Sequence, residues 1–373
     1  MATITSAQSG YWDDPETWVG GVVPDLSNDD VVVADYHSVT MDGGPLTLAS
    51  GREITVNQYG MLELWSDVTV ESGASIYVNG ALVVSAYLDV RGHVQVAVTG
   101  WLDDYGTVAV LDGGTVDVYG SISVYPYAYF DVVYGSSLYI YGSFHQEWSA
   151  NSYFYQGSYI SVESSGSAYF DGYLYIEDYS DLYVYGDGEF SYSSSVEVRY
   201  YGELYVESGG SLIIRSYLDV TDSGYLYVHG DVTLEGSLYA YGYSQVYVEY
   251  AGLLTINGYV SVEYDSMLMV YYDGKVVVGR YGALEAYYNG SIYFDYLSRA
   301  DLFGYFSLDY DAYLYLGGEA LVRVYRNIYV SGRMESGGGK MVMMRREGRI
   351  NDYYGNTLFV FDQAYGYAPR LIA

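Results

Sequence analysis

The chain has 373 residues, a formal net charge of −32 at pH 7 and a sequence pI near 4.1. An acidic chain of this kind lacks the basic footprint that nucleic-acid binding requires, so nucleic acid is not an expected partner. Cysteine is absent, which excludes disulfides and thiolate metal sites, and no apolar run in the sequence is long enough to cross a bilayer.

The N-terminal segment carries a recognisable motif. Residues 9–24 are SGYWDDPETWVGGVVP, followed by DDVVV at 29–33 and HSVTM at 37–41. The tryptophans Trp12 and Trp18 can cover the open end of an apolar column, while Gly20, Gly21 and Pro24 force turns. We therefore expect an N-terminal cap over residues 1–45.

This segment resembles the opening of G8-like, β-helix-containing surface proteins, which reads Trp-x5-Trp-x-Gly-Gly-x-x-Pro and then Asp-x-Val. It is also similar to the start of many bacteriophage structural and tail proteins. The resemblance covers about 40 residues and implies a β-helix that belongs to a virion or a cell surface. A chain that starts directly at Met1, without the basic and apolar segments of a secretory signal, matches virion proteins better than secreted adhesins.

A repeat of about 22 residues governs residues 46–330. From Val56 to Leu316 an apolar residue recurs thirteen times, mostly 22 positions apart, and another aliphatic residue stands two positions before each. Side chains two apart on a strand point to the same face. Such a fixed period indicates a solenoid, in which each coil buries its apolar face against its neighbours. An ordinary β-sandwich would not keep this register over so long a stretch.

Each repeat divides into three short strands. Within one repeat the apolar pattern recurs at steps of six or eight, as at Val118, Val124, Val132 and Ile140, and the breaks are mostly Gly, Ser, Asp or Tyr-Gly. Glycine permits the positive φ of a sharp corner. Parallel crossovers strongly prefer the right hand. The sequence therefore predicts an all-β fold, a right-handed parallel β-helix of about 13 coils.

Tyrosine is unusually frequent, with 53 residues. Strand alternation turns outward those that stand between two buried aliphatics, and we expect them to form an aromatic ladder. Its members are Tyr77, Tyr139, Tyr183, Tyr205, Tyr227, Tyr247, Tyr293 and Tyr315. Tyrosine suits strands and stacks well with itself, so the ladder can be packing alone. Alternatively it is a docking face for a protein neighbour or a glycan.

The last segment, residues 331–373, departs from the repeat and is expected to be a C-terminal cap and assembly element. Three glycines at 337–339 precede an apolar run at 341–344 that is flanked by arginines. Residues 1–51 carry acids and no Lys or Arg, so the two ends can attract one another between subunits. The expected assembly residues are Trp12, Trp18, Arg333, Arg345, Arg346 and Arg349. The partners are then further copies of the chain, in a homo-oligomer or filament, or other virion or surface proteins.

The sequence contains few residue patterns that indicate catalysis or metal binding. The four histidines are scattered without metal-ligand spacing. Acids that could form catalytic pairs are expected by chance among 47 carboxylates, and include Asp103 with Asp104, Asp178 with Asp181, and Asp301 with Asp309 and Asp311. Corner acids such as Asp265, Asp273 and Asp295 lack the calcium-repeat pattern. We predict no catalytic, metal or cofactor site, and no enzymatic activity.

The sequence thus predicts a structural or adhesive β-solenoid of a virion appendage, such as a tail or head fibre, on a virion or extracellular surface. A cell-surface filament or adhesin is the alternative with the same architecture, and glycans are candidate ligands. A polysaccharide-cleaving β-helix enzyme is the alternative from another class. It would need groove walls built from insertions longer than about 12 residues, and none occurs between Val56 and Leu316.

Overall fold

The structure, a computed structural model, describes residues 2–344, 347–351 and 357–362. The chain divides into two compact units, Met1–Gly188 with Ser193–Ser195 and Glu189–Tyr192 with Val196–Ala373, and each is described by itself. In both units successive turns of the chain add strands to the same three sheets, in which neighbouring strands are parallel except for β47 (Glu347–Asn351) and β48 (Thr357–Asp362) at the C-terminal end. We name these the first, second and third sheet, in the order in which the chain enters them.

The N-terminal unit contains three parallel sheets and one short 3-10 helix, η1 (Pro15–Thr17). Its first sheet is β1 (Thr3–Thr5), β3 (Asp30–Val33), β6 (Glu53–Val56), β9 (Ser75–Val78), β12 (His93–Val96), β15 (Thr115–Val118), β18 (Ser137–Ile140), β21 (Tyr159–Val162) and β24 (Asp181–Val184). Its second sheet is β2 (Gly10–Tyr11), β4 (Ser38–Met41), β7 (Met61–Leu64), β10 (Ala81–Val84), β13 (Trp101–Asp104), β16 (Ser121–Val124), β19 (Ser143–Gln146) and β22 (Ser167–Phe170). Its third sheet is β5 (Leu46–Leu48), β8 (Val68–Val70), β11 (Tyr87–Val90), β14 (Thr107–Val110), β17 (Tyr129–Val133), β20 (Asn151–Tyr155) and β23 (Tyr173–Ile176). The strand β25 (Asp187–Phe190) spans the boundary of the two units.

The C-terminal unit repeats this arrangement. Its first sheet is β27 (Glu203–Val206), β30 (Tyr225–Val228), β33 (Gln245–Val248), β36 (Met267–Val270), β39 (Ser291–Phe294), β42 (Tyr313–Gly317) and β45 (Arg333–Gly337). Its second sheet is β28 (Ser211–Ile214), β31 (Asp231–Leu234), β34 (Leu253–Ile256), β37 (Lys275–Val278), β40 (Arg299–Leu302), β43 (Leu321–Val324) and β46 (Lys340–Met343). Its third sheet is β26 (Ser195–Val198), β29 (Tyr217–Thr221), β32 (Ser237–Tyr241), β35 (Tyr259–Val262), β38 (Ala283–Ala286), β41 (Tyr305–Leu308), β44 (Ile328–Val330), β47 (Glu347–Asn351) and β48 (Thr357–Asp362).

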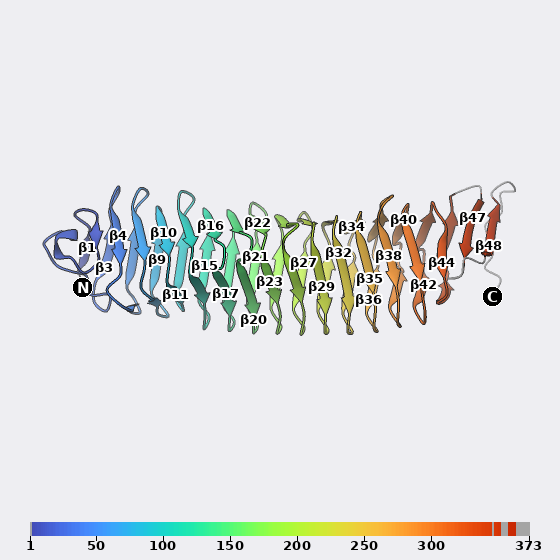
Figure 1. Cartoon of the computed structure of the whole chain (residues 1–373), viewed down its shortest axis with the longest axis horizontal. Helices are drawn as coiled ribbons and strands as arrows, with labels where there is room; N and C mark the ends of the chain where they lie inside the picture. The colour runs from blue at the N-terminus through green and yellow to red at the C-terminus, as the bar shows by residue number, and fades with distance from the viewer. Residues whose placement is uncertain (1, 345–346, 352–356, 363–373) are drawn as a thin grey trace. The chain divides into compact units, whose positions relative to one another are not determined.

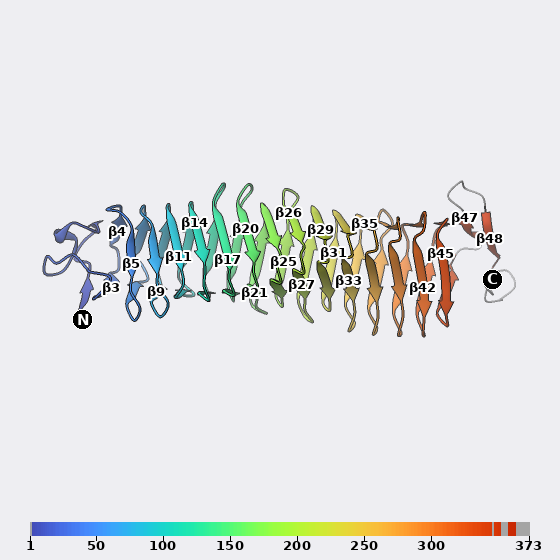
Figure 2. The same ribbon diagram turned by 90° about the horizontal axis from the view of Figure 1, so that it is seen from below.

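This architecture confirms the predicted parallel β-solenoid, with about 14 turns of about 22 residues. Figure 1 shows successive coils lying side by side within each unit, and Figure 2 shows the same strands from below. The register is regular: Leu204 pairs with Leu226 and Val206 with Val228, one coil further on. The handedness of the winding stays a prediction.

The core is a stack of inward-facing aliphatic side chains. All thirteen residues of the predicted register and the aliphatics two positions before them are buried, with at most 2% of any side chain exposed. Strands alternate in burial, as in β30, where Leu226 and Val228 are buried and the residues between them are partly exposed. Each buried aliphatic contributes about 1.5–3 kcal/mol relative to an exposed one, and the coil above and the coil below both cover it.

Both predicted end segments, residues 1–45 and 331–373, contribute strands to these sheets. Within residues 1–45, β3 pairs in parallel with β6, and β4 pairs with β7. Within residues 331–373, β45 pairs with β42 and β46 with β43. After these strands, β47 pairs in parallel with β44, and β48 then returns antiparallel to β47. Parallel pairing with the solenoid strands therefore extends into both predicted end segments.

The corners are tight turns that hold side chains in the left-handed region. In the C-terminal unit Tyr264 and Asp265 have φ of 48° and 63°, and Tyr288 and Asn289 have φ of 44° and 67°. Positive φ at both central residues is the type I′ geometry, which usually selects Gly, Asn or Asp. The glycine that follows has a separate role, because a β-carbon at Gly290 would lie 1.9 Å from the carbonyl oxygen of Val262.

A buried ion pair joins three coils of the second sheet. Asp301 is 5% exposed, and the Nη2 atom of Arg323 donates to its Oδ2 atom at 2.6 Å. The Nε atom of Arg323 lies 2.6 Å from Oδ1, at ion-pair distance without hydrogen-bond alignment. On the other side, Lys275 Nζ is 3.7 Å from Oδ2. Removing the arginine would leave a buried carboxylate with only the lysine to compensate it.

We therefore expect Arg323→Met to lower the free energy of unfolding by about 2 kcal/mol. This is less than the loss for a fully buried pair, because the arginine side chain is 37% exposed and Lys275 remains. Denaturant unfolding measures the difference. As a control, Arg333→Met removes an arginine that is 75% exposed and should cost less than about 1 kcal/mol. Equal losses for the two variants would contradict the assigned pairing.

Candidate functional site: the tyrosine ladders and a tyrosine-lined hollow

The eight tyrosines of the predicted ladder all lie on the outer face of the first sheet, and all are half-buried. In the C-terminal unit Tyr205 and Tyr227 stack face to face with ring centroids 4.5 Å apart, and Tyr227 and Tyr247 follow at 5.0 Å. The next coil places Met269 in this column, and Tyr293 and Tyr315 resume it with tilted rings at 6.0 Å. The methionine therefore divides the column into a stacked part and a tilted part.

In the N-terminal unit the same column is discontinuous. Tyr77 contacts the ring of His93 at 6.1 Å, and Tyr139 and Tyr183 each contact Tyr159, at 5.7 and 5.2 Å. Smaller polar side chains occupy the positions between these tyrosines, among them Ser161. In this unit the ring contacts therefore link the predicted ladder tyrosines to two rings outside the ladder, His93 and Tyr159.

Further stacks lie at the corners of the C-terminal unit, where sequence reasoning did not place them. After the first-sheet strands, Tyr250, Tyr272 and Tyr296 stack at 5.4 and 5.5 Å. After the third-sheet strands, the stack consists of Tyr264, Tyr288 and Tyr310, at 5.1 and 4.9 Å. The six corner rings are 44–62% exposed. The recurrence of Tyr two residues after the last buried apolar residue of a strand was the available signal.

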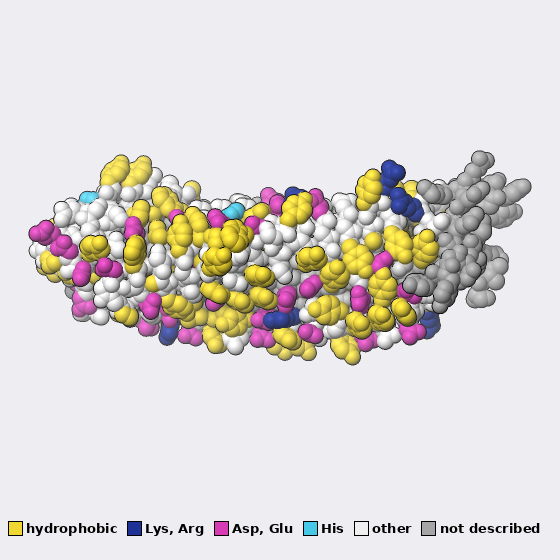
Figure 3. Space-filling model, viewed as in Figure 1, with side chains coloured by type: hydrophobic (Ala, Val, Ile, Leu, Met, Phe, Trp, Pro, Cys, Tyr) yellow, Lys and Arg dark blue, Asp and Glu magenta, His cyan; other side chains and the backbone are white. Residues whose placement is uncertain are grey.

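Aromatic side chains and carboxylates share the visible surface of each unit. Figure 3 shows hydrophobic side chains, which include tyrosine, spread over this face with Asp and Glu between them and few Lys or Arg. Because each ring follows a strand of its own coil, the rings repeat at the spacing of the coils.

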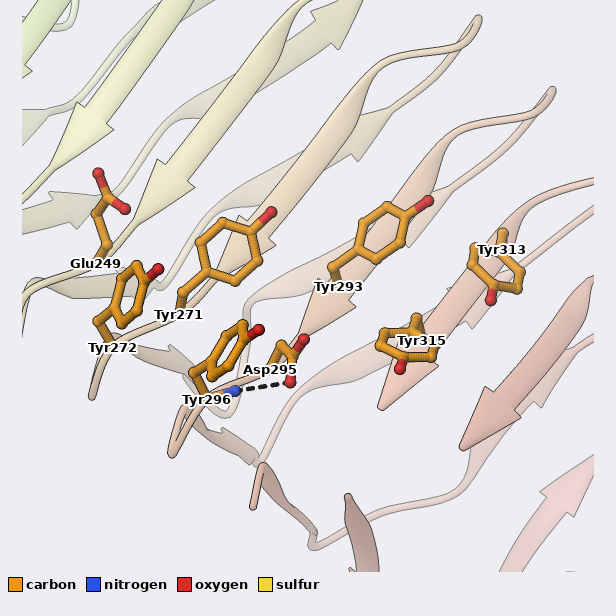
Figure 4. Close-up of a pocket in the computed structure, with 8 residues that line it drawn as sticks. All are labelled: Glu249, Tyr271, Tyr272, Tyr293, Asp295, Tyr296, Tyr313 and Tyr315. Carbon is orange, nitrogen blue, oxygen red and sulfur yellow. Dashed lines mark hydrogen bonds between the residues drawn. The ribbon is translucent and has the colours of Figure 1, made fainter. Parts of the chain in front are cut away.

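The first sheet of the C-terminal unit also carries a hollow of about 440 Å³ beside the corner that follows it. We name it the tyrosine hollow. Its lining consists of two carboxylates, Glu249 and Asp295, and six tyrosines, Tyr271, Tyr272, Tyr293, Tyr296, Tyr313 and Tyr315. Figure 4 shows the rings of Tyr271, Tyr272 and Tyr296 near Asp295, with Tyr293 between them and Tyr313 and Tyr315.

Two tyrosines of the hollow, Tyr271 and Tyr313, have a raised pKa and are neutral phenols at physiological pH. Burial raises the pKa of the Tyr271 hydroxyl, and the nearby tyrosine and carboxylate groups raise it further. Burial and a hydrogen bond to Glu335, 3.1 Å from the phenol oxygen, raise the pKa of Tyr313. The negative charge of the lining therefore comes from its carboxylates.

The N-terminal unit has a second hollow, also of about 440 Å³, with a different lining. Trp101 and Tyr119 provide aromatic surface, and the hydroxyls of Ser121, Ser143 and Ser167 come from successive second-sheet strands. No charged residue belongs to this lining. The two hollows therefore offer different chemistry to a ligand.

The acids that the sequence analysis considered as catalytic pairs have different environments. Asp103 and Asp104 are neighbours on β13 and face opposite sides of the sheet, because Asp104 is fully buried and Asp103 is partly exposed. Asp301 is engaged by Arg323. Within the described residues no group of three or more His, Cys, Asp or Glu side chains could hold a metal ion. No helix among these residues is long and apolar enough to span a membrane.

The residues predicted for assembly have different environments. Trp12 and Trp18 are 4% and 2% exposed and pack edge to face at 4.9 Å, with Trp18 Nε1 donating to the Trp12 carbonyl oxygen at 2.8 Å. They form part of the interior at the N-terminal end. Arg333 is exposed and pairs with Glu335. Of the remaining predicted residues, Arg345 and Arg346 lie outside the described residues, and Arg349 is described only through its backbone in β47.

No protein family and no curated protein matches the chain. Among solved structures, the crystal structure of a TibC-catalysed hyper-glycosylated TibA fragment is similar, with a TM-score of 0.47 and 17% sequence identity over 92% of this chain and 98% of that one.

Proposed function

We propose that this protein is a structural and adhesive β-solenoid of a virion appendage, which binds its target through the outward-facing tyrosines. The observation that carries the proposal is the set of exposed tyrosines at positive φ. More than half of the described non-glycine residues with positive φ are tyrosines, although Gly, Asn or Asp would fit the same turns at lower energy.

A left-handed conformation costs a bulky residue roughly 1–2 kcal/mol. Ring stacking between coils offsets part of this cost, at about 0.5–1.5 kcal/mol per pair. The rings nevertheless remain about half exposed, so they are not held in place to fill a core. Strained residues that persist on a surface are commonly found where a protein binds its ligands, and exposed tyrosine is favoured at such interfaces.

The location on a virion rests on the resemblance of residues 9–41 to the G8-like cap and to bacteriophage structural proteins. A cell-surface filament or adhesin would use the same face in the same way. The expected partners are further copies of the chain, other virion or surface proteins, and glycans. A net charge of −32 disfavours nucleic acid. We further propose that the chain is not an enzyme, because Asp103 and Asp104 face opposite sides of β13 and Asp301 is paired with Arg323.

The test is a triple variant at one corner, Tyr264→Asn with Tyr288→Asn and Tyr310→Asn. Asparagine tolerates positive φ, so the fold should keep its melting temperature within a few degrees while three exposed rings are lost. Labelled full-length protein is applied to a printed array of surface glycans and to a panel of bacterial cells. We expect the wild type to bind a subset of these targets and the variant to bind at least about tenfold more weakly.

Two results would contradict the proposal. Unchanged binding by the triple variant would show that the corner rings are not the adhesive surface. Release of reducing sugar ends from a bound polysaccharide, abolished by substituting one carboxylate, would assign an enzymatic role instead.

A further inference from the structure

The tyrosine hollow differs in charge from the rest of the aromatic surface, and the inference that follows rests on the adhesive role proposed above. Its two carboxylates stand among six tyrosines, and the lining contains no Lys, Arg or His. A ligand that enters this hollow therefore meets aromatic faces and a negative potential.

The rings are presented in more than one orientation. Tyr272 and Tyr296 stack at the corner with centroids 5.5 Å apart, and Tyr271 stands at 65° to Tyr272 at 6.1 Å. Rings that are all parallel to one another present their faces to a ligand from a single direction. Rings set at an angle to one another can contact a compact, rounded group from two sides, as in the aromatic cages that bind quaternary ammonium groups.

The carboxylates are available to a ligand to different degrees. Asp295 Oδ1 accepts a hydrogen bond from the Tyr296 backbone N–H at 2.8 Å, and within the described part of the chain no cationic side chain lies at ion-pair distance from Asp295. Glu249 contacts the ring of His229, whose Nε2 atom is 3.2 Å from Oε1. Asp295 is therefore the principal uncompensated charge of the hollow.

The protein already places its own cations on tyrosine rings. The guanidinium of Arg333 lies 5.5 Å from the ring centroid of Tyr313, which lines the hollow. In the same unit, Arg280 lies over Tyr281 at 5.9 Å and Arg199 over Tyr200 at 5.3 Å. Contact between an organic cation and a tyrosine face thus recurs on this surface.

We propose that the tyrosine hollow binds a substituted ammonium group of the choline type, carried by the surface to which the protein attaches. Such a cation is weakly hydrated and loses little on leaving water, while the ring faces and Asp295 both attract its positive charge. A neutral sugar could donate hydroxyl hydrogen bonds to the uncompensated carboxylate but would gain no charge–charge attraction from it. A strongly hydrated primary ammonium would lose more hydration in the same contact.

The experiment uses full-length protein in low-salt buffer and two small probes of nearly equal shape. Choline carries the positive charge, and 3,3-dimethylbutan-1-ol replaces its quaternary nitrogen with carbon. Chemical-shift changes and calorimetry report binding. We expect choline to bind about tenfold more tightly than the neutral probe, and its binding to weaken as salt is added.

Variants locate the site. Asp295→Asn should reduce choline affinity several-fold while leaving the weak binding of the neutral probe unchanged. The double variant Tyr272→Asn with Tyr296→Asn removes two rings at corner positions where asparagine tolerates positive φ, and should lose choline binding. The matched control, Tyr288→Asn, removes a corner ring outside the hollow and should bind choline as the wild type does. Melting temperatures confirm that each variant is folded.

Equal affinity for choline and the neutral probe would overturn the proposal, and so would choline binding that survives the double variant. Absence of choline binding also overturns it. The adhesive role is judged separately, on cells and glycans with the Tyr264, Tyr288 and Tyr310 triple variant. Attachment through the corner rings without any choline binding would leave the proposed function standing and remove only this ligand.

Discussion

Ile214→Asp should unfold the C-terminal unit at a much lower denaturant concentration than the same change one residue earlier, Ile213→Asp. Both isoleucines belong to β28, but Ile214 is 0% exposed in the core and Ile213 is partly exposed on the outer face. The inward change loses about 2–3 kcal/mol of apolar burial and adds the cost of a desolvated carboxyl group. We expect a total loss of at least about 4 kcal/mol.

The outward change should cost less than about 1 kcal/mol, because the new carboxylate remains in contact with water. Solenoids unfold coil by coil as well as all at once, so hydrogen exchange of the neighbouring coil complements the denaturant midpoint. Similar losses for the two variants would mean that the assigned inward and outward faces are wrong.

The second large effect is a dependence of stability on pH that originates at Asp104. This residue replaces an aliphatic in the core column, because its partners in the coils before and after it are Val84 and Val124. Its Oδ1 atom accepts from Gly106 N–H at 3.0 Å, while Oδ2 is buried without a partner. Burial raises the pKa of Asp104 to about 8, and the nearby carboxyl of Asp131, itself with a pKa raised by burial to about 7, adds to the shift.

A folded-state pKa above the unfolded value of about 3.9 means that the folded chain holds more protons than the unfolded chain between these two values. The contribution of Asp104 to the stability of the N-terminal unit should therefore be fully present below about pH 4, decrease as the pH rises, and level off above about pH 8. One pKa unit corresponds to about 1.4 kcal/mol, so Asp104 can account for a loss of up to about 6 kcal/mol over this range.

Asp104→Asn should remove the part of this slope that Asp104 contributes and leave the part due to Asp131, and it should be more stable than the wild type at pH 9, because a neutral amide avoids the desolvated charge. Asp104→Val should also be more stable than the wild type at pH 9, but its gain in unfolding free energy should be about 1 kcal/mol smaller, because the hydrogen bond to Gly106 is lost. Thermal unfolding from pH 5 to 9 measures both. Glu53→Gln, which removes an exposed carboxylate from the same unit, controls for net charge. A wild-type slope in Asp104→Asn would refute the assignment.

The sequence by itself determined the solenoid and its core. Because strands place alternate side chains on opposite faces, the 22-residue register of aliphatics was sufficient to assign Leu204, Val206, Leu226 and Val228 to the interior. It also placed Tyr205, Tyr227 and Tyr247 in one outward column. These features depend only on the 22-residue repeat and on the alternation of side chains along a strand, and both can be read from the sequence.

The tertiary structure decided what periodicity leaves open. The corner tyrosines stack only because the left-handed turns of successive coils coincide in space. The tyrosine hollow combines residues from four coils, Glu249 to Tyr315, and its shape depends on ring orientations that no spacing specifies. The burial of the Asp104 carboxyl and the pairing of Asp301 with Arg323 likewise arise from contacts between coils, whereas Trp12 and Trp18 pack against each other within the N-terminal segment. Such contacts are set by which side chains meet across the 22-residue step, and their energies depend on burial and distance in three dimensions.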